Sequence, residues 1–101
     1  KDSFLPQALI QEFLSKDEAV KNSTYALGWD TPSENGSSSG KYFSAHSVGH
    51  LGFTGTSIWW DLEKNCHIVL LSNRVHPSRK NEKIKEFRPF IHDLIMKMLN
   101  P

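Results

Sequence analysis

The sequence contains few of the residues that form cross-links, and it has no long apolar run. Its single cysteine, Cys66, excludes an intrachain disulfide, and no apolar segment approaches the ~20 residues that cross a bilayer as a helix. The formal net charge is only +1, which favours neither nucleic acid nor an acidic partner. These features argue against disulfide-rich scaffolds, membrane spans and strongly charged binding proteins.

Histidine is better represented, with five residues, but their spacing does not predict a metal centre. No HExxH motif is present, and one cysteine cannot make a zinc cluster. His46 and His50 would share one face of a strand but lie ~13 Å apart, too far to bind the same ion. We therefore expect neither a metal nor another cofactor.

The chain does contain enough apolar surface for a core. Its 101 residues fit one small domain, and a hydrophobic content of 38%, with three tryptophans and six phenylalanines, is typical of a folded chain. There is no initiator methionine or signal peptide, and the chain opens at Lys1 in what resembles the approach to a helix. We therefore expect residues 1–101 to form a single partial domain, as a fragment or a processed product.

The stretch from Ser47 to Asp61 dominates the expected fold. It has glycines at positions 49, 52 and 55 and no proline, and it ends in a β-branched and aromatic run, 56–60. Because glycine has no Cβ, a ligand or a second chain can lie flat against a strand wherever glycine occurs. We interpret the stretch as a strand whose first half leaves its backbone bare and whose second half packs.

The remaining patterns predict an α+β fold, with an antiparallel sheet of roughly three to five strands and flanking N- and C-terminal helices. A loop rich in serine and glycine interrupts the chain at 33–40. The expected strands are 25–29, 41–48, 56–61 and 67–72, the last two joined as a hairpin. Residues 67–72 are continuously apolar, so this strand needs cover on both faces.

Two helices are expected, one near each end of the chain. Residues 6–14 carry apolar side chains at 9, 10, 13 and 14, with Pro6 in the first turn. Pro89 begins the second helix, after a separate helical turn within 81–87. The apolar stripe of this helix, which predicts that it lies on the sheet, is Ile91, Leu94, Ile95, Met98 and Leu99.

The motif His50-Leu51-Gly52, followed by Phe53-Thr54-Gly55-Thr56-Ser57, resembles the third box of the serine β-lactamase and penicillin-binding protein superfamily. That box is Lys-Thr-Gly or Lys-Ser-Gly, and many class C-like and esterase-like members carry His-x-Gly instead. The resemblance extends from about Tyr25 onward. It includes the segments 25–29, 58–61, 67–73, 74–77 and 88–93.

The resemblance implies the C-terminal part of a β-lactamase or transpeptidase-like domain, in an extracytoplasmic protein, periplasmic or secreted. It assigns the cationic position of the box to His50 and an oxyanion-hole N–H to Phe53, just after Gly52. Leu51 and Thr54 would contact substrate. Leu51 lacks the hydroxyl that helps hold a substrate carboxylate, which favours an esterase or peptidase over a β-lactamase. Without the resemblance, His50 would be a strand histidine that hydrogen-bonds nearby loops.

The superfamily's nucleophile motifs are missing. Ser-x-x-Lys at the start of a buried helix and a later Tyr-x-Asn or Ser-x-Asn are required, and the only literal matches are 38–41 and 33–35. Both lie in the serine-rich loop and in reversed order, so we interpret them as accidents of composition. The chain is therefore expected to supply one wall of an active site. Its partner would be the missing N-terminal half of the parent hydrolase, and it would be inactive alone.

The competing hypothesis is a non-catalytic module that binds a partner or a second copy through an exposed strand edge. Uncovered apolar strands predict a homo-oligomer. No nucleic-acid partner is expected, because glutamates interrupt the basic stretch 74–88 and no aromatic ladder accompanies it. We interpret that stretch as a solvated helix face; its cationic residues are Arg74, Arg79, Lys80, Lys83, Lys85 and Arg88.

Overall fold

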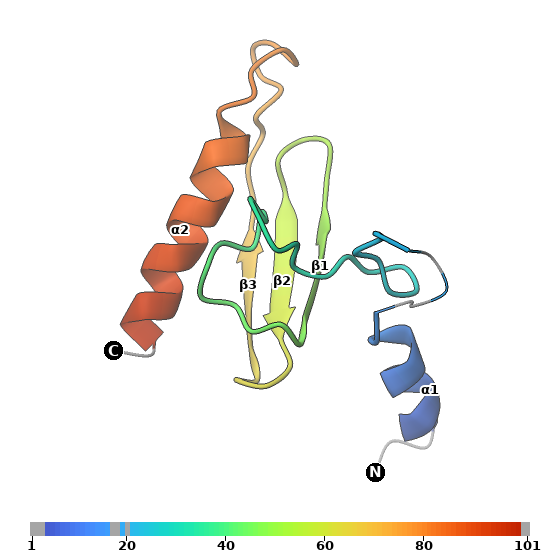
Figure 1. The fold of residues 1–101 in the computed structure, drawn as a ribbon. Coiled ribbons are helices and arrows are strands. Elements are labelled where there is room, and N and C mark those ends of the chain that lie inside the picture. The colour runs from blue at the N-terminus through green and yellow to red at the C-terminus, as the bar shows by residue number, and fades with distance from the viewer. Residues whose placement is uncertain (1–3, 17–18, 20, 100–101) are drawn as a thin grey trace.

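A computed structural model describes residues 4–16, 19 and 21–99, and it confirms an α+β fold. Three strands form one antiparallel sheet in the order β1-β2-β3, and Figure 1 shows a helix at each end of it. The strands are β1 (Ser47–Leu51), β2 (Ser57–Asp61) and β3 (Cys66–Leu70); the helices are α1 (Gln7–Phe13) and α2 (Ile84–Leu99).

The stretch 47–61 is a hairpin rather than one continuous strand. The Gly52 N–H donates to the Thr56 carbonyl at 2.8 Å, and the Gly55 N–H donates to the Gly52 carbonyl at 3.0 Å. Gly55 has φ of 104°, a conformation that only glycine adopts readily. The chain therefore reverses at residues 52–56. The second hairpin, β2–β3, confirms the pairing expected between 56–61 and 67–72.

Gly49 explains why the first strand needs glycine, and the prediction of a bare backbone there is wrong. Gly49 pairs with Trp59 across the β1–β2 ladder and is buried. A Cβ on Gly49 would overlap the benzo ring of that indole. The Trp59 ring of the same molecule thus fills the space that a side chain at residue 49 would occupy. This part of the strand is therefore not open to a ligand.

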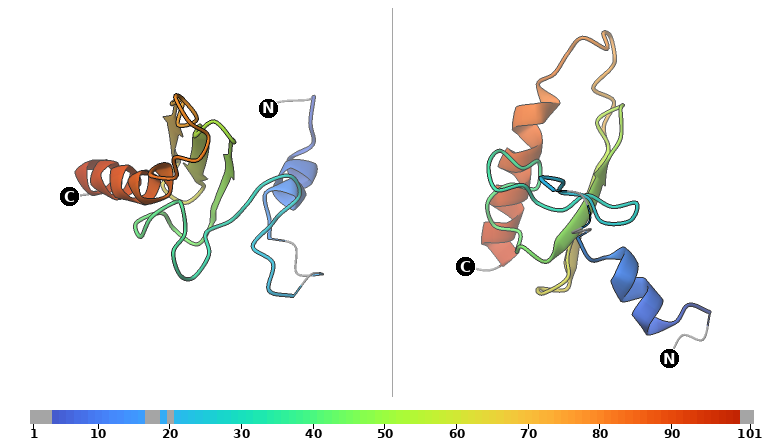
Figure 2. Two further views of the ribbon diagram at one scale, coloured as in Figure 1. Left: turned by 90° about the horizontal axis from the view of Figure 1, so that it is seen from above. Right: turned by 45° about the vertical axis from the view of Figure 1, so that its right-hand side comes forward.

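The core lies between the sheet and α2. Phe43, Trp59, Ile68 and Met96 form its buried cluster, and Trp59 is only 1% exposed. The Trp59 Nε1–H also donates to the Ser38 hydroxyl at 3.1 Å, which fixes the serine-rich loop over the same face. In Figure 2, that loop lies beside α2.

Helix α2 differs from the prediction in both its start and its buried face. It begins at Ile84 and carries Pro89 inside it. The turn before Pro89 is held because Arg88 donates through Nη2 to the carbonyls of Gly52 and Thr56, at 3.3 and 3.2 Å. The buried side chains of α2 are Arg88, His92 and Met96, whereas Leu94 and Met98 of the predicted stripe are exposed.

Two predicted strands are mostly irregular. Residues 25–29 form a turn, in which the Ala26 N–H donates to the Trp29 carbonyl at 2.7 Å. Asp30 follows and pairs with the outer edge of β1 through two backbone hydrogen bonds with Gly49, of 2.8 and 2.9 Å. Of residues 41–48, only the last two belong to a strand. Local composition favours strands here, but outside β1 the described residues of these segments pair only through two isolated bridges, Tyr25 with Asp30 and Asp30 with Gly49.

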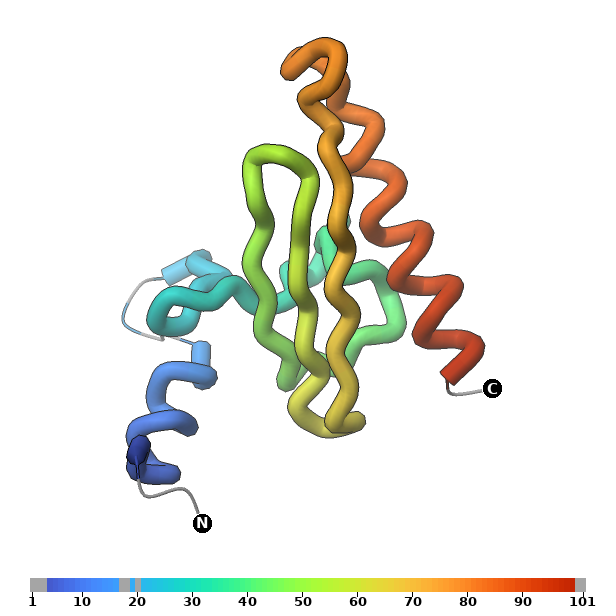
Figure 3. Tube along the Cα trace, turned by 180° about the vertical axis from the view of Figure 1, so that it is seen from behind, coloured from blue at the N-terminus to red at the C-terminus, as the bar shows by residue number. Residues whose placement is uncertain are grey.

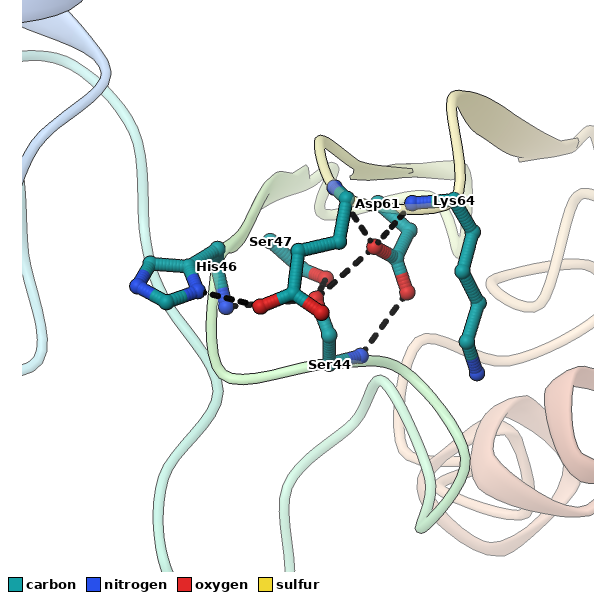
Figure 4. Close-up of polar contacts among 6 residues, drawn as sticks. Ser44, His46, Ser47, Asp61 and Lys64 are labelled. Atoms are coloured by element: carbon teal, nitrogen blue, oxygen red, sulfur yellow. Dashed lines mark hydrogen bonds and ion pairs between the residues drawn. The ribbon is translucent and has the colours of Figure 1, made fainter.

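The turn that joins β2 to β3 is built around one buried carboxylate. Asp61 has no exposed surface and accepts hydrogen bonds from the N–H and hydroxyl of Ser44 and from the N–H groups of Glu63 and Lys64, as Figure 4 shows. Burial alone would raise the pKa of Asp61, but these hydrogen bonds together hold it below its ordinary value. The carboxylate therefore ties the loop before β1 to the β2–β3 turn.

Helix α1 confirms the helix predicted over 6–14, with Pro6 as its N-cap. It lies beyond β1, at the opposite end of the sheet from α2, as the view from behind in Figure 3 also shows. Between α1 and the sheet is an apolar cavity of about 450 Å³, and its lining includes Leu9, Phe13, Trp29 and Trp60. The described residues therefore cover the second face of the sheet near Trp60, whereas Val69 on that face remains 53% exposed.

The packing of Gly49 against Trp59 generates a stability prediction. Gly49→Ala should lower the free energy of unfolding by about 1–3 kcal/mol, the usual cost of overpacking a core. Urea denaturation followed by tryptophan fluorescence measures this cost. In a Trp59→Leu background, which makes room for the methyl group, the same substitution should cost less. An equal cost in both backgrounds would contradict the proposed overlap.

Candidate functional site

The residues proposed from sequence lie together where β1 ends and the β1–β2 turn begins. His50 pairs with Ile58 and lies on the face of the sheet opposite Trp59 and α2, since neighbouring residues of a strand point to opposite faces. Leu51 and Phe53 are 37% and 58% exposed. Thr54 is exposed at the tip of the turn. Residues 50–54 therefore form one accessible end of the sheet.

The backbone of Phe53 has the geometry of a free donor. Its N–H makes no hydrogen bond to any residue that the structure describes, whereas its carbonyl accepts from the Arg74 Nε–H at 2.8 Å. The Phe53 ring has the guanidinium of Arg74 at 4.6 Å and that of Arg79 at 5.2 Å from its centroid. These contacts hold the residue in place while leaving the amide available.

The loop beyond β3 supports this turn from the other side. The backbone N–H of Arg74 donates to the Thr54 carbonyl at 2.8 Å. Its Nη1 donates to the carbonyls of Arg79 and Asn81 at 2.7 and 2.9 Å. One arginine therefore links the tip of the first hairpin to the whole segment that leads into α2.

The literal Ser-x-x-Lys match does not form a nucleophile. The Ser38 hydroxyl accepts the indole N–H of Trp59, and the Ser38 carbonyl accepts from His92. Lys41 lies in a loop, and its backbone N–H donates to Asp93 at 2.7 Å. The second match is also in a loop, where the Ser33 hydroxyl donates to the Asn35 carbonyl at 3.1 Å. These serines stabilise loops, and neither begins a helix.

The histidines are dispersed. His46 lies just before β1 and pairs with Glu63 at 2.5 Å on the surface. His92 is fully buried on α2, and its Nδ1–H donates to the Ser38 carbonyl at 2.8 Å. Within residues 4–16, 19 and 21–99, no three His, Cys, Asp or Glu side chains gather in a way that could hold a metal ion.

Sequence reasoning missed Arg88, which it placed on a solvated face. This side chain is only 6% exposed and reaches the first hairpin turn from α2. Burial lowers the pKa of Arg88, and the positive charge of Arg74 lowers it further. The one available signal was its position directly before Pro89, between the apolar residues Phe87 and Phe90. The contact itself joins residues 36 positions apart and has no local signature.

Comparisons with family models, with curated proteins and with solved structures find no match to this chain. Among the described residues, no helix is both long and apolar enough to cross a membrane.

The buried imidazole of His92 generates a pH prediction. Burial lowers its pKa below the usual value of about 6.5 and outweighs the hydrogen bond to Ser38, which favours the charged form. The unfolded chain therefore binds this proton more readily, so stability should fall as the pH drops below about 6.5.

The test compares His92→Gln with the native chain. Urea midpoints measured between about pH 7.5 and 5.5, one unit either side of the ordinary histidine pKa, should fall less steeply for His92→Gln than for the native chain. Identical slopes for the native chain and His92→Gln would show that His92 does not titrate differently on folding.

Proposed function

We propose that this chain forms one wall of the active site of a serine hydrolase of the β-lactamase and penicillin-binding protein superfamily. The observation that carries the proposal is the Phe53 N–H, directly after the His-x-Gly sequence of residues 50–52, which has no hydrogen-bond partner among the residues that the structure describes. An oxyanion hole needs backbone donors that no other group has already engaged. The β1–β2 turn supplies such a donor at an accessible edge.

The roles of the neighbouring residues follow from their positions in the motif. The Phe53 N–H would stabilise the tetrahedral intermediate, and His50 would take the place of the cationic residue of the box. Leu51 and Thr54 would contact the substrate. Because Leu51 has no hydroxyl to bind a carboxylate, the proposed substrate is an ester or a peptide rather than a β-lactam.

The nucleophile and its lysine would come from residues outside this chain, in the N-terminal half of the parent hydrolase. A serine there would attack the substrate carbonyl, and the resulting oxyanion would lie against the Phe53 amide. We place this hydrolase outside the cytoplasm, as in the resembling superfamily. The chain therefore contributes transition-state stabilisation and no covalent chemistry of its own.

Two measurements test this function. Alone, the chain should show no turnover of p-nitrophenyl esters above a heat-denatured control, and no serine should carry an acyl group by mass spectrometry. In the complete hydrolase, Phe53→Pro removes the N–H and should lower kcat by about 10²–10³. Phe53→Ala keeps the N–H and is the matched control. Similar losses for both variants would show that the ring, not the amide, matters.

Self-association is a second candidate function, which the outer surface of α2 favours. Phe87, Phe90, Leu94 and Met98 recur at helical spacing and are 44%, 61%, 46% and 74% exposed. They form a second apolar stripe that no described part of the chain covers. Exposed stripes of this kind mark interfaces, and a helix presenting one can pack against the same stripe of a second copy.

We expect a dimer in solution if this stripe is an interface. Light scattering at tens of micromolar should give twice the mass of one chain, and Phe90→Glu with Leu94→Glu should reduce it to one. Leu71→Glu, at a 79% exposed apolar residue outside α2, is the control and should leave the dimer intact. A single-chain mass for the unsubstituted protein would rule the interface out.

A further inference from the structure

A cavity of about 290 Å³ lies where the first turn of α2 meets the β1–β2 turn and the loop after β3. These three segments come together at one end of the molecule, in the upper part of Figure 1. The cavity is lined by Leu51, Gly52, Phe53 and Ile84 and by four charged side chains, those of Arg74, Glu82, Lys85 and Arg88. Three of these side chains are cationic and one is acidic, so the lining has an excess of positive charge.

Arg88 is the best-buried charge in this lining. Its side chain is 6% exposed, and its hydrogen bonds to the described residues run from Nη2 to the carbonyls of Gly52 and Thr56, at 3.3 and 3.2 Å. Its Nε–H is buried and has no partner in the described part of the chain. A buried guanidinium usually has a carboxylate or other anion beside it, because an unpaired buried donor is costly.

No side chain in the described residues neutralises Arg88. Among the described residues, Lys85 forms an exposed ion pair with Glu82 at 3.2 Å, and Glu63 contacts His46. The charge of Arg74 acts on Arg88 and lowers its pKa, because it is of the same sign. Glu82, the acidic residue of the lining, is thus paired with Lys85 at the surface. The Nε–H of Arg88 remains without a partner among the described residues.

We propose that this cavity binds a small oxyanion, a carboxylate or a phosphate group. Arg88 would supply the charge-assisted hydrogen bond from the base of the site, and Lys85 and Arg74 would close it from α2 and from the loop. Glu82 would release Lys85 to the incoming anion. Leu51 and Phe53 also line this cavity, so it adjoins the proposed hydrolase site, but anion binding requires neither a nucleophile nor the Phe53 amide.

The NMR resonance of the Arg88 Nε–H reports directly on anion binding. In a ¹⁵N-labelled chain at constant pH and ionic strength, phosphate should shift the Arg88 Nε–H resonance downfield and to saturation, together with the amide of Gly52. Sodium chloride replaces phosphate as the baseline, and acetate is titrated separately. A response to phosphate alone, to acetate alone or to both would support the site and identify which oxyanion it accepts.

Matched lysine substitutions test the location. Lys85→Gln should weaken binding by about fivefold, since it removes one charge from the lining. Lys83→Gln makes the same change two residues away, outside the lining, and should leave the affinity within about twofold at physiological ionic strength. Both changes are at exposed residues, so folding is preserved where Arg88 variants, which lose two carbonyl contacts, could fail to fold.

An Arg88 Nε–H resonance that does not move with either anion would overturn the proposal. So would equal weakening by Lys85→Gln and Lys83→Gln, because that pattern indicates general screening of a basic surface. Neither result would bear on ester hydrolysis, which is measured separately through Phe53.

Discussion

The packing of the Trp59 ring against the backbone of Gly49 is the contact on which the rest of the structure depends. Trp59 is on the central strand, and its indole fills the space that a side chain at residue 49 would occupy. The same indole contacts Phe43 at a centroid distance of 6.2 Å and donates to Ser38. One aromatic ring thus determines how closely two strands approach and where the serine-rich loop lies.

Periodicity and turn composition were sufficient for the α+β class, the first helix and the β2–β3 hairpin. They were insufficient where a distant contact decides the outcome. Pro89 predicted a helix start because proline favours the first helical turn. The helix nevertheless begins at Ile84, and Arg88 stabilises the turn before Pro89 by donating to the carbonyls of Gly52 and Thr56. Packing against the core around Trp59 likewise determines which face of α2 is buried, and this face contains His92 rather than Leu94.

The candidate site was partly predictable for a geometric reason. Residues 50–54 are consecutive, so any fold that places them at a strand end brings them together, and the sequence motif located them without knowledge of the sheet. Arg74 and Arg88 come from later segments, and their convergence on the same turn depends on the docking of α2 and of the loop after β3. The pattern of charges along 74–88 does not distinguish the buried Arg88 from its solvated neighbours.

The connectivity of the sheet has a consequence for how the chain folds. All three strands come from residues 47–70 and are joined only by the short turns 52–56 and 62–65, so closing the sheet costs little loop entropy. Proteins with such sequence-local pairing reach their transition state quickly. The meander can therefore assemble as a unit, with the Asp61 turn formed early. Docking of α2, whose Met96 must reach Trp59, is then the later and more non-local step.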